Sequence, residues 1–227
     1  MIAAFSQGAS GDQNPLYLRP STNAMASRAG VEITGYEMKR EPIEAPVRGM
    51  PDAPPADPDV LDNLMRMIES EGQLLGEEVI RVMSTVTDIS GNVRIRGIQR
   101  TFTCPGRTRV NFDMNDPAYR EGVEAEYVDG PDVEHHLGIL GLGTTVIAYS
   151  DGEIFSHISQ RIKKKSPPTN TMFVELAFGR GVSYIPDDAS FVRQTFQVLN
   201  ARDKPGCAEQ TLVRGISEMI IDYNNGL

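Results

Sequence analysis

The stretch that decides the fold is residues 207–226, CAEQTLVRGISEMIIDYNNG. Its large apolar residues recur at spacings of three and four, which is typical of one face of an α-helix. These residues are Leu212, Ile216, Met219, Ile220 and Tyr223, and the opposite side carries Glu209, Gln210, Arg214, Glu218 and Asp222. The chain has no tryptophan and needs its strongest aliphatic stripe for a core. We therefore expect this helix to pack on a sheet of its own domain.

The expected sheet lies upstream, within residues 88–178. There, apolar residues alternate with charged ones, the period-two pattern of strands with one wet face. The predicted strands lie within residues 109–114, 123–127, 139–149, 154–158 and 171–178. Asp151-Gly152 is a turn signal between two of them.

Further helices are predicted on both sides of this sheet. Asp57 and Pro58 suit a helix start, apolar residues recur at helical spacing after them, and Gly72 suits its stop. Residues 74–83 fit either a second helix or a strand. Asp187 and Asp188 suit the cap of a helix that carries Val192, Phe196 and Leu199. Segregated helices and strands predict an α+β fold, a mostly antiparallel sheet with flanking helices.

An extended N-terminal arm is expected before this domain. Residues 1–58 hold eight of the fifteen prolines together with many glycines, so they have no steady helical or strand period. We therefore predict an arm over residues 1–58 and a single domain over residues 59–227. Apolar anchors spaced along an arm suit binding along another protein surface. The residues predicted to bind a partner are Leu16, Tyr17, Leu18, Arg19, Tyr36 and Ile43.

Charge and composition narrow the class of protein. The net charge of -9 argues against a general nucleic-acid binder, which needs cationic phosphate contacts. Two cysteines do not make a disulfide framework, and we expect Cys104 and Cys207 to be buried or incidental thiols. With no apolar run of membrane-spanning length and no leader pattern, we expect a soluble protein inside a cell or organelle, without membrane insertion.

Arginines and acids are unevenly distributed along the predicted strands. Arg94, Arg96, Arg100, Arg107 and Arg109 precede a stretch that is rich in acids. One interpretation is an arginine face for an anion or a nucleic acid. The favoured interpretation is an antiparallel sheet in which arginines pair with acids across strands. Arg161 and residues 163–165 are expected to form a basic, solvated loop, and the alternative is a docking site for an acidic neighbour.

Two other groups resemble functional motifs. His135 and His136 suit metal ligands or an acid–base pair, but neighbouring residues of a strand point to opposite faces, so we favour surface or loop positions. Gly138, Gly141 and Gly143 resemble a phosphate loop, but their spacing favours glycines that ease a tight strand crossing.

Several short stretches near the C-terminus follow an order that resembles the late helices of phycobiliproteins. They are VSY (182–184), DAS (188–190), VRQTF (192–196), PG (205–206) and GISEM (215–219). The arm in turn resembles the arms of phycobilisome linker proteins, which thread through rings of light-harvesting subunits. The sequence departs from phycobiliproteins upstream, where it predicts a sheet, and neither cysteine has the pattern of a bilin attachment site. The resemblance implies a phycobilisome connection, on the stromal side of the thylakoid.

Together these observations predict a non-enzymatic structural or linker subunit of a large multi-protein assembly, with protein partners and no cofactor. The alternative is an enzyme or small-ligand-binding protein whose site is made of dispersed residues. Its pocket would lie between the sheet and the last two helices, near Cys207, His157 and Glu175.

Overall fold

The computed structural model describes residues 5–13, 58–87, 91–110, 125–166, 170–179, 183–193 and 195–226. The chain forms two compact units, one of residues 1–13 with 92–227 and the other of residues 14–91. The units divide the chain at residues 13 and 91, whereas the sequence predicted a division at residue 58. Among the described residues, no helix is long and apolar enough to cross a membrane.

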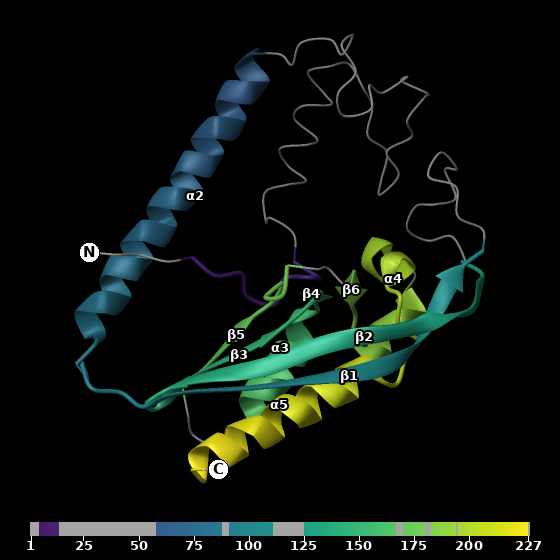
Figure 1. The fold of residues 1–227 in the computed structure, drawn as a ribbon. Helices are drawn as coiled ribbons and strands as arrows, with labels where there is room; N and C mark the ends of the chain where they lie inside the picture. Colours follow the sequence, from purple (N-terminus) through teal and green to yellow (C-terminus); the bar gives the residue numbers. More distant parts are fainter. Residues whose placement is uncertain are drawn as a thin grey trace. The chain divides into compact units, whose positions relative to one another are not determined.

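The larger unit is built on a four-stranded sheet (Figure 1). Its strands are β1 (Ile95–Arg109), β2 (Tyr127–Leu142), β3 (Thr145–Ser150) and β5 (Asn170–Val174), in the order β1-β2-β3-β5. The pairs β1–β2 and β2–β3 are antiparallel, and β3–β5 is parallel. Two short parallel strands, β4 (Glu153–Ile154) and β6 (Tyr184–Ile185), form a second sheet. The α+β class and the mostly antiparallel sheet are therefore confirmed.

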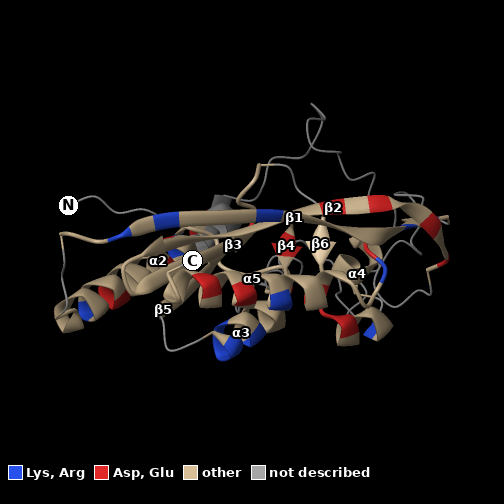
Figure 2. Ribbon diagram, turned by 60° about the horizontal axis from the view of Figure 1, so that its bottom comes forward, with Lys and Arg blue, Asp and Glu red and all other residues tan. Residues whose placement is uncertain are grey.

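Helices α3 (Ser156–Lys165) and α5 (Ala208–Asn224) cover one face of the four-stranded sheet, as Figure 2 shows. On β2, Val133, Leu137 and Ile139 point to this face and are buried. The five apolar residues of the predicted stripe on α5 are all buried. The predicted packing of this helix on its own sheet is therefore confirmed. The predicted polar side is wrong at Glu209, which is 4% exposed.

The glycines of β2 make room for aromatic rings. A Cβ on Gly141 would lie 2.2 Å from the ring of Tyr223, so only glycine lets this part of α5 approach the strand. The Tyr223 hydroxyl donates to the carbonyl oxygen of Gly143, at 2.8 Å. Gly143 has a φ of 60° in the turn between β2 and β3. These contacts fit the interpretation of close backbone approach, not that of a phosphate loop.

The strand predicted over residues 154–158 is wrong beyond Ile154, because α3 begins at Ser156. Ile158 and Ile162 are both fully buried, and their spacing of four places them on one face of a helix. The basic loop predicted for Arg161 and residues 163–165 is instead part of this helix, in which Arg161 pairs with Glu209 of α5. The three lysines of its last turn interact favourably with the negative end of the helix dipole.

The helix predicted after Asp187 also differs from the structure. Residues 187–199 form a 3₁₀-helix, η2 (Asp188–Arg193), and a separate helix, α4 (Phe196–Asn200). Asp187 accepts from the backbone N–H of Ser190, whereas α4 has its own cap in Thr195. Strand segments predicted within residues 111–124 lie outside the described residues.

The second described unit consists of helix α2 (Pro58–Thr85) and the residues that follow it. The helix begins at Pro58, as predicted, but it continues through Gly72. A helix-interior glycine costs only about 1 kcal/mol, which the remaining strong helix formers offset. Residues 74–83 are therefore the second half of one long helix.

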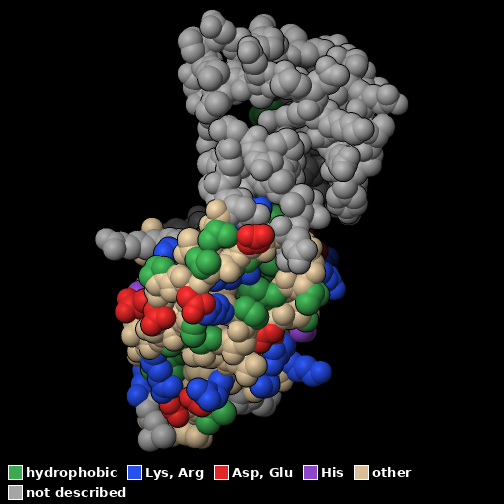
Figure 3. Space-filling model, turned by 90° about the vertical axis from the view of Figure 1, so that its right-hand side faces the viewer, with side chains coloured by type: hydrophobic (Ala, Val, Ile, Leu, Met, Phe, Trp, Pro, Cys, Tyr) green, Lys and Arg blue, Asp and Glu red, His purple; other side chains and the backbone are tan. Residues whose placement is uncertain are grey.

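The ion pairs of β1 reach the helix layer. Arg100 lies 3.2 Å from Asp222 and 3.5 Å from Glu218, both on α5. Cross-strand pairing, the favoured interpretation, is wrong for Arg100, because this residue lies on the face that α5 covers. The distribution of charge on β1, β2 and α5 is visible in Figure 2, and the face in Figure 3 carries interspersed side chains of both signs.

Candidate functional site

A buried polar cluster lies where β1, β2 and the loop before α5 meet. Its centre is His135 of β2, whose side chain is fully buried. The ring stacks on that of Phe102, its cross-strand partner, with 4.9 Å between the centroids. The predicted surface or loop position is therefore wrong for His135, because the strand directs this residue to the helix-covered face.

The end of β3 brings the first carboxylate to this histidine. In the register of β2 and β3, Leu137 pairs with Ser150, so the next residue, Asp151, lies beside His136. Asp151 Oδ1 lies 3.4 Å from His135 Nδ1. Asp151 Oδ2 accepts from the backbone N–H of His136 at 2.8 Å and lies 3.2 Å from His136 Nδ1. One carboxylate thus contacts both histidines, although their side chains leave opposite faces of the strand.

A bulge in β1 brings the second carboxylate. The register of β1 and β2 shifts between Cys104 and Gly106, and the chain before α5 pairs with this point. Gly106 forms an antiparallel bridge with Asp203, and the N–H of Lys204 donates to the carbonyl oxygen of Pro105 at 2.9 Å. Asp203 Oδ1 then lies 2.8 Å from His135 Nε2.

The electrostatics of the cluster favour a protonated histidine. Burial alone would lower the pKa of His135, but the hydrogen bonds and negative charges of Asp151 and Asp203 together raise it to about 9. Near neutral pH the imidazolium therefore donates to a carboxylate from each nitrogen. Both carboxylates are buried, so these bonds replace the water that the three groups lose.

One atom of the cluster is left over. Asp203 Oδ2 is buried and has no hydrogen-bond partner within the part of the chain that the structure describes. An unsatisfied buried acceptor costs about 1–3 kcal/mol, and more when it is charged. Such an atom requires an explanation beyond packing.

A disulfide borders the cluster. Cys104 of β1 and Cys207, the residue before α5, are joined across 103 residues of sequence. The prediction of two buried or incidental thiols is therefore wrong. Disulfides persist in oxidising compartments and are rare in reducing ones. The disulfide therefore does not by itself test the expected location inside a cell or organelle, which stays a prediction. Cys104, His135 and Asp203 also form a group whose potential ligand atoms lie within 4.8 Å of one another.

Arg107 fixes the loop beside this cluster. Its guanidinium donates to the carbonyl oxygens of Ala201 and Val198 and stacks over the ring of Tyr127, at 3.9 Å from the centroid. Burial lowers the pKa of Arg107, while the charges of Tyr127 and Asp203 raise it. The residue thus ties the end of α4 to β1 and does not present its charge to solvent as an anion-binding face would.

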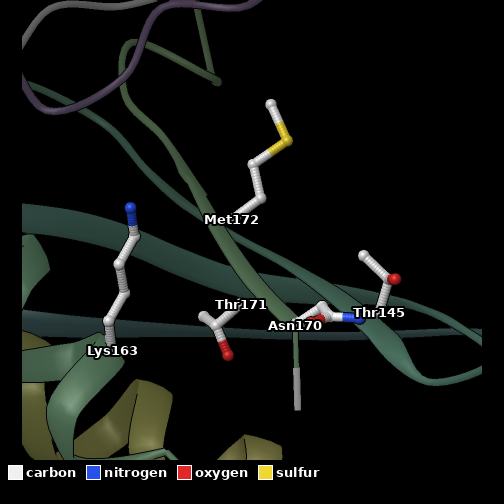
Figure 4. A pocket seen from close by; sticks show the side chains of 5 residues that line it. All are labelled: Thr145, Lys163, Asn170, Thr171 and Met172. Atoms are coloured by element: carbon white, nitrogen blue, oxygen red, sulfur yellow. The ribbon is translucent and has the colours of Figure 1, made fainter. Parts of the chain in front are cut away.

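The residues of the predicted pocket do not converge. Cys207 is in the disulfide, His157 is exposed on α3, and Glu175 is buried and accepts from the N–H of Ile154 in β4. The structure has a hollow of about 410 Å³ elsewhere, lined by Thr145, Lys163, Asn170, Thr171 and Met172. In Figure 4 the side chains of Lys163, Met172 and Thr145 extend the same way but stand well apart, whereas that of Thr171 points the other way, so the polar groups do not converge on one point.

Glu175 instead anchors the N-terminal segment. Its carboxylate accepts from the Ser10 hydroxyl at 2.6 Å and from the N–H of Ile154 at 2.7 Å. Asp12 accepts from the N–H of Ser156 at 2.7 Å, next to the start of α3. Residues 5–13, expected within an arm that reaches away, therefore contact their own domain. The predicted partner-binding residues Leu16, Tyr17, Leu18, Arg19, Tyr36 and Ile43 lie outside the described residues.

A second candidate site is the exposed apolar face of α2. Large apolar residues of this segment are 44–69% exposed: Met65, Ile68, Leu74, Leu75, Val79, Ile80, Val82, Met83 and Val86. Five of them lie in one row on α2 at the alternating three- and four-residue spacing that also passes through Gly72: Met65, Ile68, Leu75, Val79 and Val82. Val86, just after the helix, continues the same spacing. This spacing is the heptad pattern of a coiled-coil seam. The sequence analysis missed it because it ended the helix at Gly72.

Comparisons with known proteins leave the family open. No family model matches the chain, and no curated protein matches it. One similar solved structure is "Ceramidase complexed with C2", at 12% identity and a TM-score of 0.36. The match covers 40% of this chain and 15% of that chain. A similarity of this size carries no argument about fold or function.

Proposed function

We propose that this protein is a non-enzymatic subunit of a multi-protein assembly and that it binds a helical partner through α2. The observation that carries the proposal is the apolar seam defined above, which runs along a helix of 28 residues. Scattered apolar residues are common on protein surfaces, but a contiguous row marks an interaction site. At ~1.5 Å per residue the helix is about 42 Å long, which suits the extended contact of a coiled coil.

Burial of the apolar seam would drive the association of α2 with a partner helix. Removing a Leu, Ile, Val or Met side chain from water stabilises a complex by roughly 1.5–3 kcal/mol. Met65, Ile68 and Leu75 are each more than half exposed, so most of this energy is still to be gained. Summed over the seam residues, this gain is comparable to the cost of lost motion on association, about 4–15 kcal/mol.

The charges beside the seam indicate the chemistry of the partner. Glu69, Glu71 and Glu78 flank the seam, whereas Arg66 and Arg81 of α2 lie off these flanks. Glu78 already pairs with Arg81 at 2.6 Å, so Glu69 and Glu71 are the acids that the flanks offer to a partner. In a coiled coil, charged residues at the flanking positions form salt bridges between the helices and so determine which helices pair. A second copy of α2 would set no base against these acids in either orientation. The partner is therefore a helix with lysines or arginines beside its own apolar seam.

The predicted arm belongs to the same proposal. Its anchor residues would add contacts on the partner, and their contribution stays a prediction. The resemblance of the arm to those of phycobilisome linker proteins suggests the phycobilisome as the assembly. The alternative of an enzyme gains no support from the described residues, because His135 is shielded from solvent and the hollow of Figure 4 lacks convergent groups.

Binding to designed peptides tests the proposal. The full chain is titrated with a synthetic heptad helix that carries an Ile/Leu seam and lysines on both flanks. The comparison peptide has glutamates on the flanks. We expect the lysine peptide to bind at least about tenfold more tightly, with a preference that falls as salt rises.

Two matched variants separate the seam from general charge attraction. Leu75→Glu adds a negative charge in the seam, and Gln73→Glu adds the same charge on an exposed position away from it. Leu75→Glu should weaken binding more than about tenfold, since one buried leucine contributes more than about 1.4 kcal/mol. Gln73→Glu should not weaken it. Equal affinity of the two variants for the lysine peptide, or a stable homodimer of the full chain through α2, would refute the proposal that the seam binds a basic helix.

A further inference from the structure

The buried cluster of Cys104, His135 and Asp203 has the composition of a metal site. Their ligand atoms, one from each residue, lie within 4.8 Å of one another, and all three residues are buried. The fourth group at this point is Cys207, whose Sγ is bonded to that of Cys104. Two sulfurs, one imidazole nitrogen and one carboxylate oxygen form a donor set that suits tetrahedral zinc.

An unpaired ligand atom supports this interpretation independently. Asp203 Oδ1 is held by His135 Nε2 at 2.8 Å, while Oδ2 is buried without a hydrogen-bond partner among the described residues. The side chain of Asp203 is only 2% exposed. A carboxylate in this state offers a lone pair that the protein itself leaves unused.

The histidine is already oriented for a metal ion. Asp151 holds His135 Nδ1, at 3.4 Å, and therefore leaves Nε2 directed at Asp203. Metal-binding histidines commonly donate from their second nitrogen to a carboxylate, which fixes the ring and raises the basicity of the ligand. Asp151 is thus a positioning residue and does not itself bind the ion.

We propose that reduction of the Cys104–Cys207 disulfide creates a zinc-class metal site formed by Cys104, Cys207, His135 and Asp203. A dithiol reductant gives up two electrons and two protons: its own disulfide forms, the Cys104–Cys207 bond breaks, and each cysteine becomes a thiol. The metal ion then displaces the proton of each thiol and the proton on His135 Nε2. Disulfide and metal are alternative occupants of one site.

The two cysteines differ in a way that gives the reductant access. Cys104 is fully buried in the core, whereas Cys207 is partly exposed at the N-terminus of α5. An attacking thiolate therefore reaches the sulfur of Cys207 first. Once reduced, the thiolate of Cys207 is stabilised by the positive end of a helix of 17 residues. The same exposed side provides the entry path that a metal ion needs.

Cobalt, a spectroscopic substitute for zinc, tests the proposal. The oxidised full chain and the chain reduced with a phosphine, both freed of small molecules by gel filtration, are titrated with Co²⁺ under nitrogen. We expect one Co²⁺ per reduced chain, with thiolate-to-cobalt charge-transfer bands and the intense visible bands of tetrahedral cobalt. The oxidised chain should show neither, and Zn²⁺ should abolish the bands.

Two variants and one control identify the ligands. Cys207→Ser should remove the charge-transfer bands or halve them, and Asp203→Asn should weaken Co²⁺ binding by at least about tenfold. Asp132→Asn is the control, because Asp132 is an exposed carboxylate of β2. A folded reduced chain that gives no cobalt bands would overturn the proposal, as would equal affinity in the wild type, Cys207→Ser and Asp203→Asn. If reduction unfolds the chain, Zn²⁺ must restore its circular-dichroism spectrum, and failure to do so also overturns the proposal.

Discussion

Reduction of the disulfide should strongly destabilise the larger unit in the absence of metal. The bond joins residues 103 positions apart, and the segment it closes includes β2, β3, α3 and β5. A cross-link of this span removes chain entropy from the unfolded state equivalent to about 4.7 kcal/mol at room temperature. Measured values for disulfides are usually lower, so we expect a loss of about 2–5 kcal/mol.

Urea unfolding of the oxidised and reduced chains, both with a chelator, measures this loss. The double variant Cys104→Ala/Cys207→Ala is the control for the reductant, which should not change its unfolding midpoint. Thiol titration of the untreated protein must find no free cysteine. Two free thiols before reduction, or equal unfolding free energies of both forms, would show that this cross-link does not stabilise the fold.

Three further changes probe the core and the buried charges. Ile216→Ala should cost about 2–5 kcal/mol of unfolding free energy, whereas the same change at Ile221, 43% exposed on the same helix, should cost less than about 1 kcal/mol; urea unfolding compares them. The folded state raises the pKa of His135 from 6.5 to about 9. The contribution of His135 to the free energy of unfolding is therefore complete below pH 6.5 and should fall as pH rises towards 9. Urea midpoints measured across this range should decline. Burial raises the pKa of Glu175, so its contribution to stability falls as pH rises above the ordinary value of 4.5. The stability of Glu175→Gln relative to the wild type should therefore be higher at pH 7 than at pH 4. The same stability difference at both pH values would contradict this.

The sequence predicts those parts of the fold whose signal is local and periodic. The stripe of α5 buries one continuous set of side chains, so its period is visible in the sequence. The apolar run 139–149, predicted as one strand, is instead the end of β2, a turn at Gly143 and β3. The short helix α3 was predicted as part strand and part loop because only Ile158 and Ile162 mark its buried face. Two apolar positions followed by three lysines do not separate a ten-residue helix from a strand and a turn.

The candidate site could not be predicted in the same way, because its members are distant in sequence. Nothing near His135 identifies Asp203, which is 68 residues away. The alternation of a strand does predict that His135 and His136 point to opposite faces. It does not predict that β3 ends where one carboxylate can contact both. The missed feature with a local signal is the heptad row on α2, which becomes visible once a single glycine is allowed inside the helix.

One local irregularity explains why the disulfide and the second carboxylate occur together. The bulge after Cys104 turns the backbone of residues 105–107 towards residues 202–204, and hydrogen bonds from Arg107 to Arg202 and from Lys204 to Pro105 fix that pairing. A Cβ on Gly106 would lie 1.8 Å from the carbonyl oxygen of Pro131 on β2, so the close approach of β1 to β2 at the bulge requires glycine. Asp203 is thereby placed on His135, and Cys207, four residues later, is placed on Cys104. Because a single pairing positions both, the disulfide and the carboxylate of Asp203 share one geometry at the buried cluster.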